Sequence, residues 1–577
     1  MKALATLRLA ALALLLTATS AAAQTQVRVT DDITTNTTWS SANEYLLDGL
    51  IFVDNGATLT IEAGTVVRGV LNTDITTGDG AAALIVRKGA KLMAVGTATS
   101  PIIFTAAEDD LSDSGDLTEE DRGLWAGLIL LGNAPTNQPT TNNQIEGIDP
   151  TSESAQYGGS DPADNSGTLR YVSIRHSGFS ISGVEGDEIQ GLTLGGVGSG
   201  TTIDYVEIFA SNDDGIEIFG GTVDIKHAAV AFSADDGFDT DQGWSGRGQF
   251  WFCIQDDDEA GRCAEQDGGD DGGTNATPFS TGAISNATYI GSGVASAPGN
   301  DGNNPLVRIR EGSAMSYFNS VFTDAPVRAL QVDEGSNGAF DAFDQFQAGR
   351  LQIVNNVFGT FGQGAAFSDF IRGDAAGTFA SYVAGGNTSA DPQVGSVCRD
   401  ADPGNCLNPR ISASSPAATG ARFDIAKLNN DADATGGTAD DDAAFFETVT
   451  YRGAFDPQAR VWIAGWTALD ALLNADATTT SIDQVNEIAA MELSITSMPN
   501  PANGVTRIAF GLTESAPVHL AVYDLMGREV AVLADGAVQP QGTFEASFDA
   551  STLAPGTYLY RLTTPNGSVS RALTVVR

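Results

Sequence analysis

The chain has 577 residues, which is enough for two or three domains. It carries 73 acidic and 29 basic side chains, and its net charge of −44 argues against binding to nucleic acid or to an anionic membrane, because such binding needs clustered cations. With 66 glycines and 42% hydrophobic residues, the composition indicates a folded protein that is rich in turns.

Residues 1–23 have the features of a secretory signal peptide. Two basic residues precede an apolar stretch at 9–16, and small residues lead up to the predicted cleavage between Ala23 and Gln24. The apolar stretch is shorter than the roughly 20 residues of a membrane-spanning helix, and no later segment is long enough. We therefore expect an exported protein without a transmembrane segment.

From about residue 25 to 420, short apolar alternations are separated by glycine, asparagine and aspartate. The segment FVDNGATLTIEAG recurs as IVRKGAKLMAVG. Three tighter repeats begin 24 and 22 residues apart, at Gly191, Gly215 and Gly237. Short strands at this period predict the coils of a parallel β-helix, in which stacking makes the buried faces continuous. Propellers and sandwiches are the alternatives, but propeller blades need about 40 residues.

Three segments resemble secreted right-handed β-helix proteins of Bacteroidota-type bacteria: YLLDGLIFVDNGATLTIEAGTVVRG, GLWAGLILLGNAP and FFETVTYRGAFDPQARVWIAGWTAL. The resemblance covers most of residues 30–475 and implies an all-β fold, a right-handed parallel β-helix or solenoid, which we place at residues 24–473. Members of that group mostly have no assigned function, so the resemblance implies a fold and not an activity.

Acidic side chains cluster in two of the repeats. Six carboxylates recur 22 residues apart, at Asp213, Asp214 and Glu217 and then at Asp235, Asp236 and Asp239. Neighbouring coils lie about 4.8 Å apart, so these charges repel one another unless they are protonated or bridged by a cation. Calcium takes six to eight oxygen ligands, and the six residues are therefore a candidate Ca²⁺ site. The alternative is that Asp-Asp-Gly simply suits a tight corner.

The same positions also resemble polygalacturonases, which are right-handed β-helices. The triplet that ends at Asp214 and the pair Asp235-Asp236 match the first two elements of their pattern, and the triplet that begins at Arg308 loosely matches the last. The Gly-His-Gly element between them is missing. The resemblance implies a polysaccharide hydrolase or lyase that acts through Asp214, Asp235 and Asp236 as acid and base.

The four cysteines form two close pairs in polar loops, Cys253 with Cys263 and Cys398 with Cys406. Two local disulfides are the favoured interpretation and agree with export, whereas no histidine lies near a cysteine to form a zinc site. The first pair bounds part of an acidic loop at residues 255–275, which we interpret as solvated, with a second calcium site as the alternative.

Other candidate residues lie beside the acidic repeats. The aromatic residues Trp244 and Phe250–Phe252 either stack on sugar rings or fill the interior of the coils. His176 and His227 occur in strand-like runs, where an outward-facing histidine is commoner than a catalytic one.

The sequence pattern changes after a polar linker at residues 474–490. Residues 491–577 contain short alternating strands, which predict a small antiparallel immunoglobulin-like sandwich. The motifs PNPANG, VYDLMGREV and LAPGTYLYRL resemble the type A C-terminal sorting domain of the type IX secretion system. The resemblance implies that the type IX secretion machinery is a partner and that the chain reaches the surface of a Gram-negative bacterium, where removal of the module and attachment to lipopolysaccharide commonly follow. An ordinary adhesion sandwich is the alternative.

Together these features predict a secreted or cell-surface β-helix protein with a binding or structural role, including contact with Ca²⁺ and a polysaccharide ligand. The alternative function is the polysaccharide hydrolase or lyase. We predict no cofactor other than Ca²⁺.

Overall fold

The computed structural model describes the chain from residue 24 onward. The residues after 23 that it does not describe are 114, 139–142, 149–154, 181–188, 270–274, 297–303, 336–338, 400–405, 429–444, 475–476, 478–493, 499–501, 503, 513–515, 524–527, 540–541, 565–566 and 577. The predicted signal peptide and most of the predicted linker lie outside the described residues. The chain forms two compact units; the first contains the described residues up to Pro457 and from Val461 to Thr478, and the second contains Gln458–Arg460 and the residues after Thr478.

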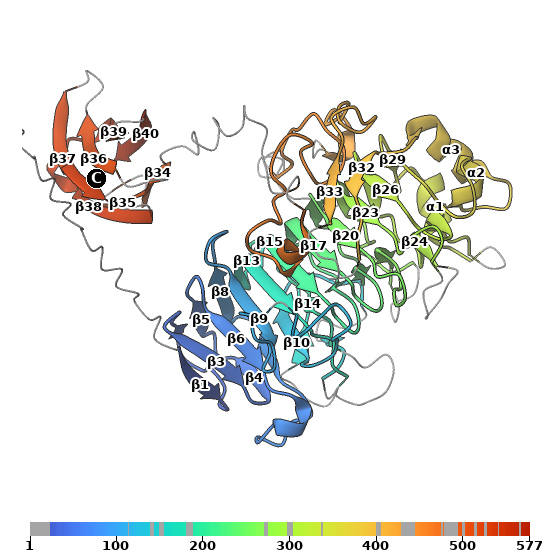
Figure 1. Ribbon diagram of the computed structural model, residues 1–577, viewed down its shortest axis with the longest axis horizontal. Helices are drawn as coiled ribbons and strands as arrows, with labels where there is room; N and C mark the ends of the chain where they lie inside the picture. The colour runs from blue at the N-terminus through green and yellow to red at the C-terminus, as the bar shows by residue number, and fades with distance from the viewer. Residues whose placement is uncertain are drawn as a thin grey trace, which may run out of the picture. The chain divides into compact units, whose positions relative to one another are not determined.

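The first unit is a parallel β-helix, as the repeats predict (Figure 1). Its strands stack in two sheets. Sheet B consists of β4 (Leu50–Val53), β7 (Ala83–Val86), β10 (Gly127–Leu131), β14 (Leu192–Gly195), β16 (Ile216–Phe219), β18 (Phe238–Asp241), β21 (Ala264–Gln266), β24 (Pro305–Ile309), β27 (Arg328–Val332) and β30 (Ile371–Arg372).

Sheet A contains two parallel ladders that join in its longer strands. It consists of β1 (Thr25–Val29), β2 (Thr37–Trp39), β3 (Asn43–Leu47), β5 (Thr58–Ile61), β6 (Val66–Gly69), β8 (Lys91–Val95), β9 (Ile102–Ala106), β13 (Gly167–Arg175), β15 (Thr202–Phe209), β17 (Asp224–Ala231), β19 (Arg247–Gln249), β20 (Phe252–Ile254), β22 (Ala283–Ser285), β23 (Thr288–Ile290), β25 (Ser316–Phe318), β26 (Val321–Thr323), β28 (Ile353–Val354), β29 (Val357–Phe358) and β31 (Thr388–Ser389).

Short strand pairs and helices occur outside the two stacked sheets. Two antiparallel pairs are β11 (Asn143–Gln144) with β12 (Gln156–Tyr157), and β32 (Val394–Ser396) with β33 (Asn408–Ile411). The helices are α1 (Ala342–Gln347), α2 (Phe367–Phe370), α3 (Thr378–Gly386), η1 (Asn72–Asp74), η4 (Ala426–Leu428) and η6 (Ala468–Leu472). Within the described part of the chain, no helix is both long and apolar enough to cross a bilayer.

The register of sheet B confirms the repeat that the glycines predict. Leu192, Ile216 and Phe238 pair across β14, β16 and β18, and all three are fully buried in the core. Alternate residues of a strand face opposite sides, so each coil adds one apolar residue to the interior and one side chain to the outside. Trp244 and Trp251 also lie fully buried in this core, with ring centroids 6.0 Å apart.

Phe250 and Phe252 are buried as well, but not in the main interior core. Phe252 packs under residues 445–473, a segment that we call the strap and that lies on the outer side of sheet A. In the strap, the Glu447 N–H donates to Gln249 Oε1 at 2.7 Å, and the Leu469 N–H donates to Glu207 Oε1 at 3.0 Å. The four predicted aromatics therefore fill the protein interior, and none is exposed to stack on a sugar.

The second unit is antiparallel. A three-stranded sheet contains β34 (Ser494–Met498), β35 (Val505–Leu512) and β38 (Gly542–Asp549), and a four-stranded sheet contains β36 (Ala516–Tyr523), β37 (Glu529–Gln539), β39 (Gly556–Thr564) and β40 (Gly567–Val575), with η7 (Ala550–Thr552) after β38. Ile508 of the first sheet and Leu520 of the second belong to one buried cluster, so the two sheets share a core. The immunoglobulin-like topology stays a prediction.

Candidate metal centre

The outward-facing row of sheet B changes from apolar to charged along the stack. Ile129 pairs with Thr193 in β14, and the same row continues through Glu217, Asp239 and Glu265. Glu217 faces outward because its neighbours Ile216 and Ile218 face the interior core. Three successive coils thus present a carboxylate at the same position.

The six predicted ligands lie together. The Asp236 N–H donates to Asp214 Oδ1 at 2.9 Å, and Glu217 pairs with Asp239 in the strand register. Carboxylate oxygens within 4.8 Å of one another form three overlapping groups, which are Asp213–Asp214–Asp235, Asp214–Glu217–Asp239 and Asp236–Asp239–Glu265. We call these seven residues the carboxylate ladder. Glu265 is the member that the sequence analysis missed.

Most of the ladder is buried. Glu217 is 7% exposed and Asp236 is 3% exposed. Two residues after Glu217 in the same strand, the Phe219 ring lies 6.0 Å from the ring of Tyr157 in β12, and the Tyr157 hydroxyl donates to Gln242 Oε1 at 2.7 Å. Burial and then the neighbouring carboxylates raise the pKa values of Asp214, Glu217 and Asp239 well above their ordinary range.

Three buried ladder oxygens lack hydrogen-bond partners among the described residues. Glu265 Oε1 lies 3.2 Å from Arg262 Nη1, whereas Glu217 Oε2 and Asp239 Oδ1 have no described arginine or lysine in ion-pair distance. Buried polar atoms in folded proteins are nearly always hydrogen-bonded, so Glu217 Oε2 and Asp239 Oδ1 each call for a partner that the described residues do not supply, such as a proton, a water molecule or a cation. None of the described arginines or lysines forms an ion pair with Asp214, Glu217 or Asp239.

The later coils differ, because arginines accompany their carboxylates. Arg262 Nη1 lies 3.2 Å from Asp236 Oδ2 and 3.2 Å from Glu265 Oε1. Arg308 pairs with Glu265 in the strand register, and Arg310 Nη2 lies 3.0 Å from Glu265 Oε2. The triplet that begins at Arg308 therefore neutralises the upper end of the ladder.

The acidic stretch at residues 255–275 is not one solvated loop. Asp256 is 3% exposed and pairs with Arg122, and Glu265 belongs to β21. Asp267 is also buried and lies 2.7 Å from Arg310 Nη2; burial raises its pKa to about 7. That interpretation was wrong for these three residues because Asp256 lies just after β20 and the chain returns to the stack as β21 after Cys263. Residues 270–274 lie outside the described part.

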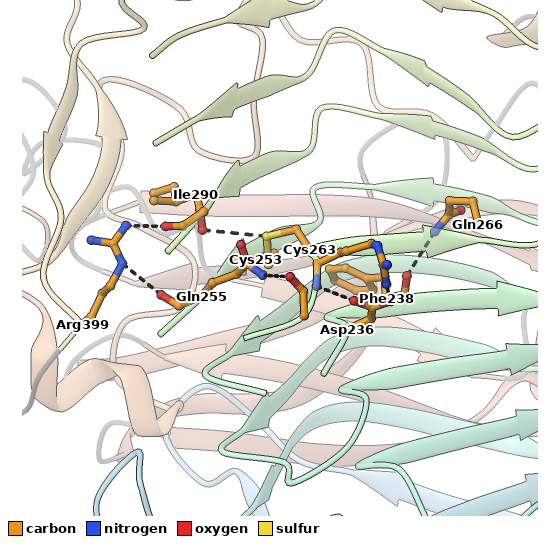
Figure 2. Close-up of a disulfide and its surroundings, with 11 residues drawn as sticks. Asp236, Phe238, Cys253, Gln255, Cys263, Gln266, Ile290 and Arg399 are labelled. Atoms are coloured by element: carbon orange, nitrogen blue, oxygen red, sulfur yellow. Dashed lines mark hydrogen bonds and ion pairs between the residues drawn. A yellow bond between two sulfur atoms is a disulfide. The ribbon is translucent and has the colours of Figure 1, made fainter. Parts of the chain in front are cut away.

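Both predicted disulfides are confirmed, Cys253–Cys263 and Cys398–Cys406. Figure 2 shows the first, which joins β20 of sheet A to the residue before β21 of sheet B. Arg399, next to the second disulfide, donates from Nε to the Gln255 carbonyl at 3.0 Å (Figure 2). The corner between the two sheets is therefore fixed from both sides.

The residues proposed for catalysis are divided between groups. Asp214 and Asp235 share one group, whereas Asp236 belongs to another and pairs with Arg262. The two histidines lie elsewhere. The His176 ring lies 2.6 Å through Nδ1 from the Asp121 carbonyl oxygen, and His227 is stacked between Tyr205 and Phe250 and lies 2.8 Å through Nδ1 from Asp204 Oδ1.

The comparisons with known proteins agree with this geometry. A family model described as a pectate-lyase-like β-helix domain matches residues 31–390. The chain belongs to this family. A second model, described as a secretion system C-terminal sorting domain, matches residues 497–576. This pectate-lyase-like β-helix protein is therefore exported, to the medium or the cell surface, and its sorting domain engages the type IX secretion machinery. No curated protein matches the chain.

Proposed function

We propose that this exported β-helix protein binds Ca²⁺ in its carboxylate ladder and that the ion joins successive coils. The observation that carries the proposal is the pair of buried oxygens without partners, Glu217 Oε2 and Asp239 Oδ1. They belong to strands β16 and β18, and a carboxylate oxygen of each lies within 4.8 Å of one from Asp214. A divalent cation between them would replace repulsion between coils with attraction.

The chemistry of the ligands favours calcium. Every candidate ligand in the ladder is a carboxylate, and the three groups contain neither a thiolate nor an imidazole. Hard cations prefer oxygen ligands, and calcium accepts irregular sets of six to eight, whereas magnesium demands near-octahedral geometry. Successive coils of a β-helix place their carboxylates by strand register, which favours the more permissive ion.

Calcium binding is expected to strengthen as the pH rises. Burial raises the pKa values of Asp214, Glu217 and Asp239, so the ion-free folded state binds protons more tightly than the unfolded state does. Raising the pH removes these protons, which destabilises the empty ladder and leaves carboxylates ready for a cation. Titration calorimetry at about pH 6 and about pH 8, in two buffers of different ionisation heat, should show tighter binding at the higher pH and proton release at the lower. Absence of binding at both values would disprove the site.

A polysaccharide hydrolase or lyase is the second candidate. The description of the family and the convergence of Asp214 and Asp235 support it, and a buried carboxyl with a raised pKa suits a general acid. In this case the protein should release products from polygalacturonate or alginate, and Asp235→Asn should lose that release. Asp31→Asn, at an exposed position of the β-helix, is the matched control. No product release from either polymer would end this candidate.

A further inference from the structure

Two of the three groups in the carboxylate ladder lie beside each other as places for a cation. One is the group Asp214–Glu217–Asp239, which we call the lower group, and the other is the group Asp236–Asp239–Glu265, which we call the upper group. They share Asp239, and each offers three carboxylates whose oxygens lie within 4.8 Å of one another. By ligand type alone, both groups could hold a divalent ion.

The two groups differ in their surroundings. In the lower group, Glu217 is more than nine-tenths buried and its Oε2 has no hydrogen-bond partner among the residues described. In the upper group, the guanidinium of Arg262 contacts two of the three carboxylates, with 3.2 Å from Nη1 to Asp236 Oδ2 and to Glu265 Oε1. Among the residues that the structure describes, no cationic side chain pairs with the lower group, whereas Arg262 pairs with the upper group.

Arg262 is fixed in place by several contacts. The backbone N–H of Arg262 donates to Asp236 Oδ1, and the side-chain Nη2 donates to Asn304 Oδ1 at 3.0 Å. The next residue, Cys263, is tied to Cys253 by the disulfide in Figure 2. Only 11% of the Arg262 side chain is exposed, so the guanidinium cannot move into solvent without breaking this corner.

We propose that Arg262 takes the place of a second cation in the upper group, so that the lower and upper groups together hold a single Ca²⁺. The proposal rests on the calcium site proposed above. A guanidinium and a divalent ion cannot share the Asp236 and Glu265 carboxylates, because two cations this close repel each other strongly where water is scarce. Phe238 pairs with Ala264 across β18 and β21, so the residues two positions before them, Asp236 and Arg262, also lie in one row of the stack. Arg262 therefore follows an acidic residue of the same row by one coil.

The test counts calcium ions in the full-length folded protein. Equilibrium dialysis at about 0.15 M salt, which screens surface charges, is followed by elemental analysis. Asp239→Asn removes the ligand that the lower and upper groups share and so defines the background, and ions bound above it belong to these two groups. The unmodified protein should hold one such ion and Arg262→Gln two. Arg422→Gln makes the same change in net charge at an exposed arginine and should stay at one ion.

Each outcome decides between the two proposals. No ladder ion in the unmodified protein would disprove the calcium site itself. Two ladder ions in the unmodified protein, or one in Arg262→Gln, would overturn the role of Arg262 while leaving the calcium site intact. If Arg262→Gln does not fold, Arg262→Met keeps the apolar stem of the side chain and gives the same count, and either variant can be prepared in calcium.

Discussion

Replacing Glu217 with glutamine is expected to make the calcium-free protein more stable and to abolish its response to calcium. Burial and then the neighbouring carboxylates raise the pKa of Glu217, so its charge destabilises the empty ladder. A neutral amide of the same shape removes that repulsion and also removes a ligand. At a calcium concentration of 100 times Kd, the unmodified protein should gain about 2.7 kcal/mol, which corresponds to roughly 3 °C in Tm for a unit of about 450 residues.

Thermal melting with calcium and with a chelator measures both effects. In the unmodified protein the chelator should lower Tm, and in Glu217→Gln the two curves should coincide above the chelated Tm of the parent. Glu108→Gln is the control, because Glu108 is exposed on the same unit, and its two curves should differ as those of the parent do. A parent protein whose Tm ignores the chelator would contradict the expectation.

Replacing Glu207 with alanine is expected to loosen the strap and to lower the free energy of unfolding by about 3 kcal/mol. Glu207 is fully buried in β15. Its carboxylate accepts hydrogen bonds from the Ala468 N–H at 2.7 Å, the Leu469 N–H at 3.0 Å and the Ser173 hydroxyl at 2.6 Å. The alanine would leave these three donors without an acceptor in the protein interior.

Denaturant unfolding measures the stability loss, and hydrogen exchange of the strap amides locates it. Exchange should accelerate at Ala468 and Leu469. Glu447→Ala is the matched control, since Glu447 also belongs to the strap but its side chain is 58% exposed, and an exposed ion pair contributes less than about 1 kcal/mol. Unchanged exchange in Glu207→Ala would show that the carboxylate does not hold the strap.

The regular part of the molecule could be predicted from the sequence because one coil follows another at constant length. The spacing of Gly191, Gly215 and Gly237 sets the register that stacks Glu217 on Asp239. Glu265 was missed because the next coil is longer: it follows Asp239 by 26 residues and after a disulfide-bridged corner.

The strap and the arginines of the ladder lay beyond such reasoning. The strap has no repeat, and its position depends on tertiary contacts such as those of Glu207 with the start of η6. Arg262 belongs to a polar corner in the sequence, and only the turn that brings Cys263 back to sheet B makes it a neighbour of Asp236. Contacts between segments that are far apart in the chain and do not share the coil repeat leave no pattern in a single sequence.

The end of the strap determines where mechanical load enters the β-helix. Leu473 belongs to the cluster that packs on sheet A, and η6 is held by Glu207 of β15, with strands of earlier and later coils on both sides. If the protein is tethered through the residues after Leu473, the pull acts on the side of the β-helix and not on a terminal coil. Tension along those residues would act first on the two hydrogen bonds that join the start of η6 to Glu207.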